Sequence, residues 1–281
     1  MVRSVLGLTV YLDDPFWAAE GAERLLRSFL ADGRSLPFYT TSRLDHWVAL
    51  GAGESLPDLF RGSDLHLSTR ARHLLDVRAA DDLDAPSTSF RFLQVAPGSP
   101  VPGFLQLTFP LDEDPETLRR LMHAICELGP VLSGSGGFTF TWMPEASGDA
   151  FAQMYKLCRR FVGFDLQVPE IAAPYARRFV PSASWLTVVS HRHAGREASL
   201  ARVERLAAVR LDPFRSCVLV TAGTRPELGD MNRMELPTAL RAVSSAFAPL
   251  FPDPPAPLPG PFSLGDATAR WMKRHFEPEG F

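Results

Sequence analysis

The stretch "VLSGSGGFTF", residues 131–140, places three glycines within four residues, directly before alternating aromatic residues and threonines. A phosphate-binding loop needs its glycines between the end of a strand and the start of a helix, where free backbone amides face the anion. Here the order is reversed, because a helical pattern precedes the glycines and a strand pattern follows them. We therefore predict a tight turn at Gly134, Gly136 and Gly137, and no nucleotide site.

One pattern, apolar–any–apolar–Thr, recurs along the chain. It occurs at Leu6–Thr9, Leu105–Thr108, Phe138–Thr141 and Val218–Thr221, with a shorter version at Trp185–Thr187. Such alternation is typical of strands that bury one face. We expect strands at 4–12, 89–95, 103–110, 137–142, 184–189 and 216–222.

Apolar residues at helical spacing predict amphipathic helices that pack against these strands. The best-marked helix has Asp114 as its N-cap and Pro115 at its first position. We expect helices near 16–31, 115–128, 149–162, 237–250 and 266–275. Residues 76–88 read as a polar, acidic loop, and residues 252–261 hold six prolines and are expected to be extended.

These elements predict an α+β fold, with a mostly antiparallel or mixed sheet flanked by amphipathic helices in a single domain over 1–281. The sequences "LGLTVYLDDP" and "LQLTFPLDEDP" both run from a strand through acidic residues to a proline. An internal duplication of a strand–helix unit, with halves near 1–100 and 101–281, therefore stays open beside the general pattern of α+β proteins.

Composition excludes several classes of protein. The chain contains no apolar run of about 18 residues, so we expect no membrane span. Its net charge of −3 gives no basic footprint, so we expect no direct binding to nucleic acid. The three cysteines are an odd number and far apart in the sequence, which favours buried free thiols and a cytoplasmic location.

No motif for catalysis or metal binding stands out. "SHRH" places His191 and His193 two residues apart, which could begin a metal site on a strand, but no third ligand follows at a fixed spacing. We therefore expect no metal and no cofactor. An enzyme with a site assembled from scattered residues, such as His191, His193 and Asp230, remains the alternative.

Several segments, in order, resemble a bacterial type VI secretion immunity family whose members accompany effectors with a VRR-Nuc nuclease domain (the TsiV-like family). Arg160–Asp165 is similar to the family's basic–aromatic–Pro–Gly–apolar–Asp signature, with Val162 in place of the proline. Ser184–Thr187 resembles its Asn-Trp-Leu-Thr strand. Gly229–Arg233 is similar to its Gly-Asp-x-Asn-Arg segment, and Ala267–Phe276 to its closing helix.

The resemblance implies a non-enzymatic immunity protein that binds and neutralises a cognate nuclease effector in the cytoplasm of the producing cell. A structural protein of the same secretion locus is a second alternative. Residues 1–120 carry 17 acidic and 12 basic side chains, and carboxylates suit a partner with a basic DNA-binding cleft. The candidate partner-binding residues are Asp13, Asp14, Asp81, Asp82, Asp84, Asp112 and Glu113.

Overall fold

One antiparallel sheet runs through the part of the chain that the computed structural model describes, which is residues 1–12, 17, 21–31, 34, 36–41, 46–49, 73–79, 81–96, 98–143 and 147–277. The strands lie in the order β3-β2-β4-β5-β6-β1-β7-β8-β10-β9. Their bounds are β1 Val2–Leu12, β2 Phe38–Thr41, β3 Val48–Ala49, β4 His73–Arg78, β5 Ser89–Gln94, β6 Gly103–Phe109, β7 Ser133–Trp142, β8 Leu186–Ser190, β9 Val209–Pro213 and β10 Cys217–Ala222.

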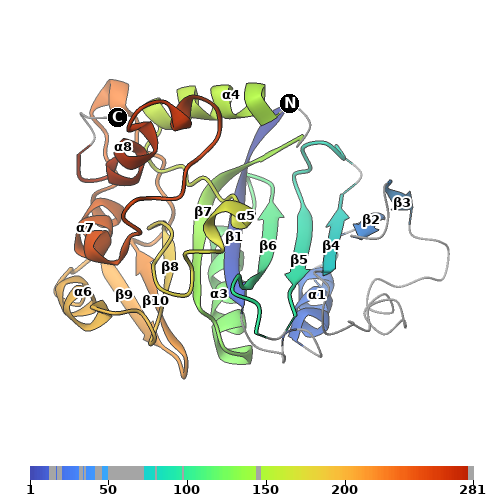
Figure 1. The fold of residues 1–281 in the computed structure, drawn as a ribbon, viewed down its shortest axis with the longest axis horizontal. Helices are drawn as coiled ribbons and strands as arrows, with labels where there is room; N and C mark the ends of the chain where they lie inside the picture. Colours follow the sequence, from blue (N-terminus) through green and yellow to red (C-terminus); the bar gives the residue numbers. More distant parts are fainter. Residues whose placement is uncertain are drawn as a thin grey trace.

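Helices cover both faces of the sheet (Figure 1). Alternate residues of β1, such as Leu6, Leu8 and Val10, pack against α1 and α3 on one face. Helices α4 to α8 lie on the opposite face. The bounds are α1 Ala22–Ala31, α3 Pro115–Leu128, α4 Ser147–Arg160, α5 Pro169–Ala172, α6 Arg196–Val203, α7 Thr238–Phe247 and α8 Ala267–Lys273, with 3-10 turns η4 Met231–Arg233, η5 Ala248–Leu250 and η6 Gly260–Ser263.

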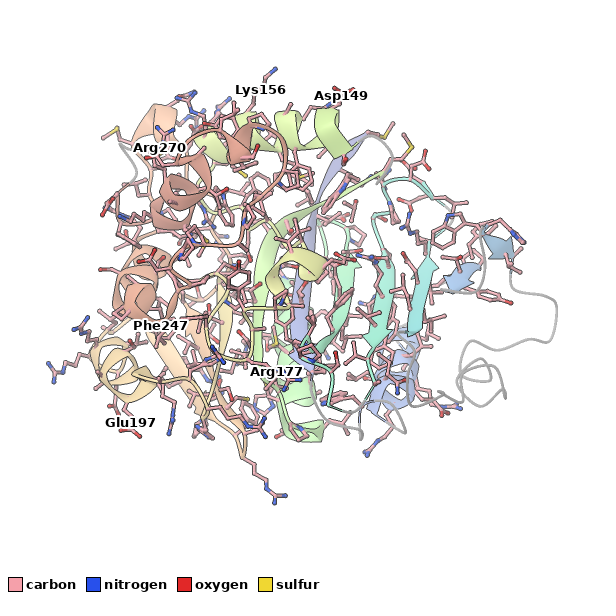
Figure 2. All side chains as sticks on the ribbon, in the orientation of Figure 1. Asp149, Lys156, Arg177, Glu197, Phe247 and Arg270 are labelled. Atoms are coloured by element: carbon pink, nitrogen blue, oxygen red, sulfur yellow. The ribbon has the colours of Figure 1, made fainter. Side chains whose placement is uncertain are left out.

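The helices are amphipathic, as their sequences predict. On α4, Met154 and Cys158 are buried, whereas Lys156 is exposed and points away from the molecule (Figure 2). Helix α3 begins at Pro115, and the side chain of Asp114 caps it by accepting a hydrogen bond from the backbone N–H of the second helical residue at 3.0 Å. In the described parts of the chain, no helix is both long and apolar enough to span a membrane.

The glycine stretch is a strand and not a turn. Residues 133–142 form β7, which pairs with β1 along ten residues and with β8 on its other side. The glycines are needed because other atoms come close: a Cβ on Gly134 would lie 2.9 Å from the carbonyl oxygen of Thr9. The side-chain amide of Gln167 also lies over this region and donates to the carbonyl oxygens of Gly7 and Ser135 at 3.3 and 3.5 Å.

The other predicted strands are confirmed to within two residues at each end, as are the helices at 115–128, 149–162 and 266–275. The helix near 237–250 is an α-helix to Phe247 and a 3-10 turn from there, and the helix near 16–31 is described as α-helix from Ala22. The predicted loop at 76–88 is wrong at its start, because Asp76 belongs to β4. Strands β2, β3, β4 and β9 and helices α5 and α6 were not predicted.

Three smaller expectations have mixed outcomes. All three cysteines are free and buried, as predicted. The proline-rich segment has no helix or strand over 252–259, but it ends in the 3-10 turn Gly260–Ser263 instead of continuing extended. The two matching sequences form β1 and β6, which are antiparallel neighbours, and their origin by duplication stays a prediction.

Candidate binding surface

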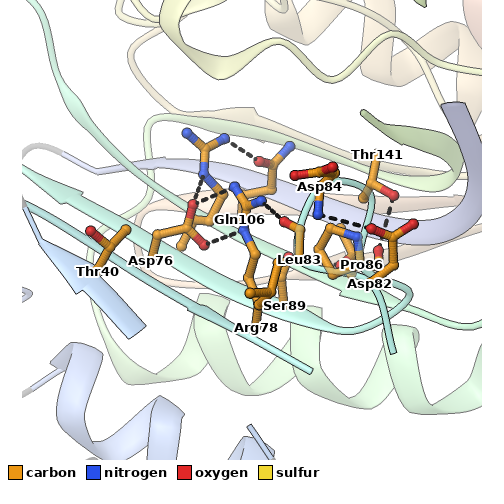
Figure 3. A network of polar contacts seen from close by, with 12 residues as sticks. Thr40, Asp76, Arg78, Asp82, Leu83, Asp84, Pro86, Ser89, Gln106 and Thr141 are labelled. Carbon is orange, nitrogen blue, oxygen red and sulfur yellow. Dashed lines mark hydrogen bonds and ion pairs between the residues drawn. The ribbon is translucent and has the colours of Figure 1, made fainter. Parts of the chain in front are cut away.

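Strands β4, β5 and β6 carry a connected set of polar side chains on one face of the sheet (Figure 3). Asp76 is 3% exposed and lies between Arg78 and Arg91, with N–O distances of 2.9 and 3.2 Å. Arg91 also donates to Gln106 at 2.9 Å and pairs with Glu170 of α5 at 2.8 Å. Burial opposes the charge on Arg91, but the two carboxylates outweigh it and raise the pKa of Arg91.

Arg78, Arg91, Gln106 and Glu170 line a hollow of about 210 Å³. The wall on the β7 side is formed by Phe140, Thr141 and Trp142, and the floor by the polar residues of β5 and β6. Small-molecule sites are mostly apolar and larger, whereas this hollow is small and its charges are already paired. The arrangement therefore fits contact with a polar macromolecular surface better than capture of a small ligand.

The acidic loop between β4 and β5 lies at the end of this surface. Asp81 forms an ion pair with Arg3 and accepts from the backbone N–H of Ser87. Burial of Asp81 favours its neutral form, but the hydrogen bonds from Ser87 and Arg3 prevail and lower its pKa. Asp82 accepts from two backbone N–H groups of the loop at 2.9 and 3.2 Å (Figure 3). Asp81 and Asp82 thus shape the loop, and Asp84 is left as its exposed carboxylate.

The acidic residues at the start of α3 also have different roles. Glu113 pairs with Arg34 at 3.1 Å, and that guanidinium lies over the ring of Phe109 at 5.2 Å. Asp114 caps the helix, and Asp112 is exposed. Glu113 therefore holds α3 to the segment after α1, so reversing its charge would disturb the fold as well as any interface.

Of the predicted set, Asp84 and Asp112 are exposed and form no ion pair with another described residue. Asp13 and Asp14 lie outside the described residues.

His191 and His193 do not form a pair. Strand β8 ends at Ser190, so both histidines lie in the turn that follows it. His191 is exposed and its Nε2 lies 2.9 Å from the carbonyl oxygen of Phe214. His193 is 1% exposed, its Nε2 lies 3.2 Å from the carbonyl oxygen of Ala176, and burial lowers its pKa. Across the described ranges, no group of three or more His, Cys, Asp or Glu is placed to hold a metal ion.

Asp230, the third residue of the enzyme hypothesis, belongs to a structural junction. It pairs with Arg160 at 2.9 Å, and this hydrogen bond lowers the pKa of Asp230. Beside it, the backbone N–H of Gly163 donates to the carbonyl oxygen of Leu228 at 2.7 Å. A Cβ on Gly163 would lie only 2.0 Å from the carbonyl oxygen of Glu227, so this position requires glycine. Segments 160–165 and 227–233 are therefore clamped together.

The C-terminal helix α8 leads into the same junction. Arg274 is 2% exposed and donates to three backbone carbonyl oxygens, two of them in segment 160–165, at 2.9 to 3.0 Å. Its guanidinium lies 4.0 Å from Asp165, which also accepts from Ser182 at 3.0 Å. Burial raises the pKa of Asp165 and lowers that of Arg274 to about 10. Three of the four segments singled out in the sequence thus meet in space and hold the fold.

Sequence reasoning missed the polar residues of the β4–β6 surface. Arg91 lies between two phenylalanines in "FRFLQ", and Gln106 between two leucines in "LQL". The sequence did contain a signal for this surface: a long polar side chain stands at alternate positions of an otherwise apolar strand pattern. It marks a sheet face that polar partners, and not the apolar core, cover.

Comparisons with known proteins agree with this architecture. The model of a family named TsiV, described as type VI immunity for VRR-NUC, matches residues 70–275. The solved structure of the T6SS protein PA0821 from Pseudomonas aeruginosa has the same fold, with a TM-score of 0.80 and 15% sequence identity over 98% of this chain and 82% of that chain. A search among curated proteins found no match. At this identity, the structural likeness shows the fold alone.

Proposed function

Because this chain belongs to the TsiV family of type VI immunity proteins, we propose that it neutralises a VRR-NUC nuclease effector by binding it in the cytoplasm of the producing cell. The family match carries the proposal, since it extends from just before β4 to the end of α8. It includes the junction of segments 160–165 and 227–233 as well as the polar surface of β4–β6.

We propose that neutralisation needs binding and no catalysis. His191, His193 and Asp230 each contact a different part of the chain and share no site. The ionisable groups of the β4–β6 surface are paired with one another, as in a rigid docking surface.

Asp84 and Asp112 are the carboxylates that we propose as contacts for the effector. A nuclease that binds DNA presents clustered Lys and Arg, and exposed carboxylates accelerate its encounter with an inhibitor. Asp81, Asp82 and Glu113 contribute indirectly, since they hold the loop and the helix that carry the two exposed residues.

The test measures binding of the purified chain to a nuclease-inactive form of the VRR-NUC effector from the same genome. We expect a stable complex and, in the cell, rescue from the active effector. Asp84→Lys with Asp112→Lys should lower the association rate about tenfold at low salt, with a smaller difference at high salt. The control, Glu204→Lys with Glu235→Lys, makes the same charge change at two other exposed positions.

Absence of a complex with the unchanged protein would refute the proposed function. Equal association rates for the aspartate variant and the control variant would instead remove Asp84 and Asp112 from the interface and leave the function standing.

A further inference from the structure

Two adjoining hollows run along the outer side of α3, between this helix and the β9–β10 hairpin. The larger, of about 660 Å³, lies at the end of α3 and is lined by residues 126–132, 190–192 and 215–216. The smaller, of about 270 Å³, is lined by residues of α3 and by Arg210 of β9. Glu127 lines both, so the hollows adjoin at this residue, and together we call them the α3 groove.

The α3 groove carries an excess of positive charge. Five arginines line it, against two glutamates and the neighbouring Asp212. These arginines are Arg119, Arg120, Arg192, Arg210 and Arg215. Two of the carboxylates already form ion pairs within the groove: Glu116 pairs with Arg119, and Asp212 pairs with Arg210 at 2.8 Å. Arg120 and Arg215, one in each hollow, are exposed.

We propose that the α3 groove binds a carboxylate-rich segment of the effector, an inference that rests on the proposed function. Guanidinium groups bind carboxylates through paired hydrogen bonds. Leu128, which is half-buried, and Pro130, which is exposed, line the larger hollow and add apolar contact area between the charges.

The alternation of charge in the groove favours a protein over a nucleic acid. Glu116 and Glu127 are exposed at 44% and 63%, and both would repel the evenly spaced phosphates of a nucleic-acid backbone. A polypeptide can place a carboxylate opposite Arg120 or Arg215 and a basic or neutral side chain opposite the two glutamates. Complementary patterns of this kind set the register of a protein–protein contact.

The larger hollow of the groove is separate from the carboxylate Asp84. Strand β7 begins beside the larger hollow, where the N–H of Leu132 donates to the carbonyl oxygen of Tyr11. It ends near the acidic loop, where Thr141 donates to the carbonyl oxygen of Pro86. Ten strand residues span about 30 Å, so variants at the two ends report on different surfaces.

The experiment compares Arg120→Glu with Arg215→Glu against a control, Arg202→Glu with Arg225→Glu, which makes the same charge change at exposed sites outside the groove. Dissociation constants for the nuclease-inactive effector are measured by calorimetry, and thermal unfolding checks that each variant is folded. We expect the groove variant to bind at least tenfold more weakly than the unchanged protein, and the control to bind within about twofold of it.

Each other outcome has a distinct meaning. If the unchanged protein does not bind the effector, the proposed function fails. If it binds and the folded groove variant binds equally well, the groove assignment fails alone. If a 20-base-pair DNA duplex binds the unchanged protein and the groove variant loses that binding, the groove is a nucleic-acid site and the assignment to a protein segment is overturned.

Discussion

Replacing Gly163 with alanine should destabilise the junction that holds segments 160–165 and 227–233 together. The new Cβ would lie 2.0 Å from the carbonyl oxygen of Glu227 and 2.8 Å from Leu228. The two backbone segments would have to separate by at least about 1 Å, which breaks the 2.7 Å hydrogen bond from Gly163 to Leu228. A lost buried hydrogen bond and an overpacked contact together cost about 2–4 kcal/mol.

The free energy of unfolding, measured by urea titration with circular dichroism, tests this value. Gly148→Ala is the matched control, because a Cβ there meets nothing within 4 Å and the residue lies in the first turn of α4. Alanine favours a helix over glycine, so this control should be neutral or stabilising by up to about 1 kcal/mol. If Gly163→Ala unfolds at the same urea concentration as the unchanged protein, the clamp does not exist as described.

Three further results are expected. Arg274→Met should lower the free energy of unfolding by about 3–5 kcal/mol, because it leaves the buried Asp165 without its cation. Arg270→Met, on the exposed side of α8, should lower it little, and equal effects of the two variants would contradict this prediction. Burial lowers the pKa of His275 in the folded state, so its contribution to stability is present above about pH 6.5. Below that pH the free energy of unfolding should fall by about 1.4 kcal/mol per pH unit. His275→Phe should reduce this slope in urea titrations between pH 7.5 and 5.5. Burial raises the pKa of Cys158 to about 12, and all three thiols are buried, so a thiol reagent should react only after unfolding; rapid labelling of the native protein would show that a thiol is accessible.

The parts of the fold that the sequence predicts are those with a local signal. Strands β1, β6 and β10 alternate clearly, and α3 has both its cap and its apolar stripe within 14 residues. Strand β4 was missed at Asp76 because a buried carboxylate looks like loop sequence until its partner is known. Its partners are Arg78 on the same strand and Arg91 on the next one, and only the folded sheet shows that both guanidinium groups reach the buried carboxylate.

The glycine stretch is a second case in which a local sequence signal predicts the wrong structure. Three glycines in four residues favour a turn locally, and that preference was decisive for the sequence prediction. In the structure, the close approach of the Thr9 carbonyl oxygen of β1 requires a residue without a side chain at Gly134. Gly134 and Thr9 are more than 100 positions apart, and nothing within the stretch itself signals their contact.

The candidate surface was predictable only in part. Acidic residues at the start of α3 and in the β4–β5 loop were identified, but the pairing of Asp81 with Arg3 and of Glu113 with Arg34 depends on distant segments. The α3 groove had no sequence signal, since its arginines come from α3, the turn after β8, and the β9–β10 hairpin. Only the antiparallel arrangement of these elements brings the charges together.

The position of β1 has a consequence for how the protein is made. This strand precedes the other described strands in the sequence, yet its two neighbours in the sheet are β6 and β7, and the second of these ends at Trp142. Until β7 has been synthesised, β1 can pair only with β6, and long-range pairing of this kind is slow. A chain that ends before β7 therefore leaves one edge of β1 unpaired, so we expect the sheet to form around β1 only when residues up to Trp142 are present.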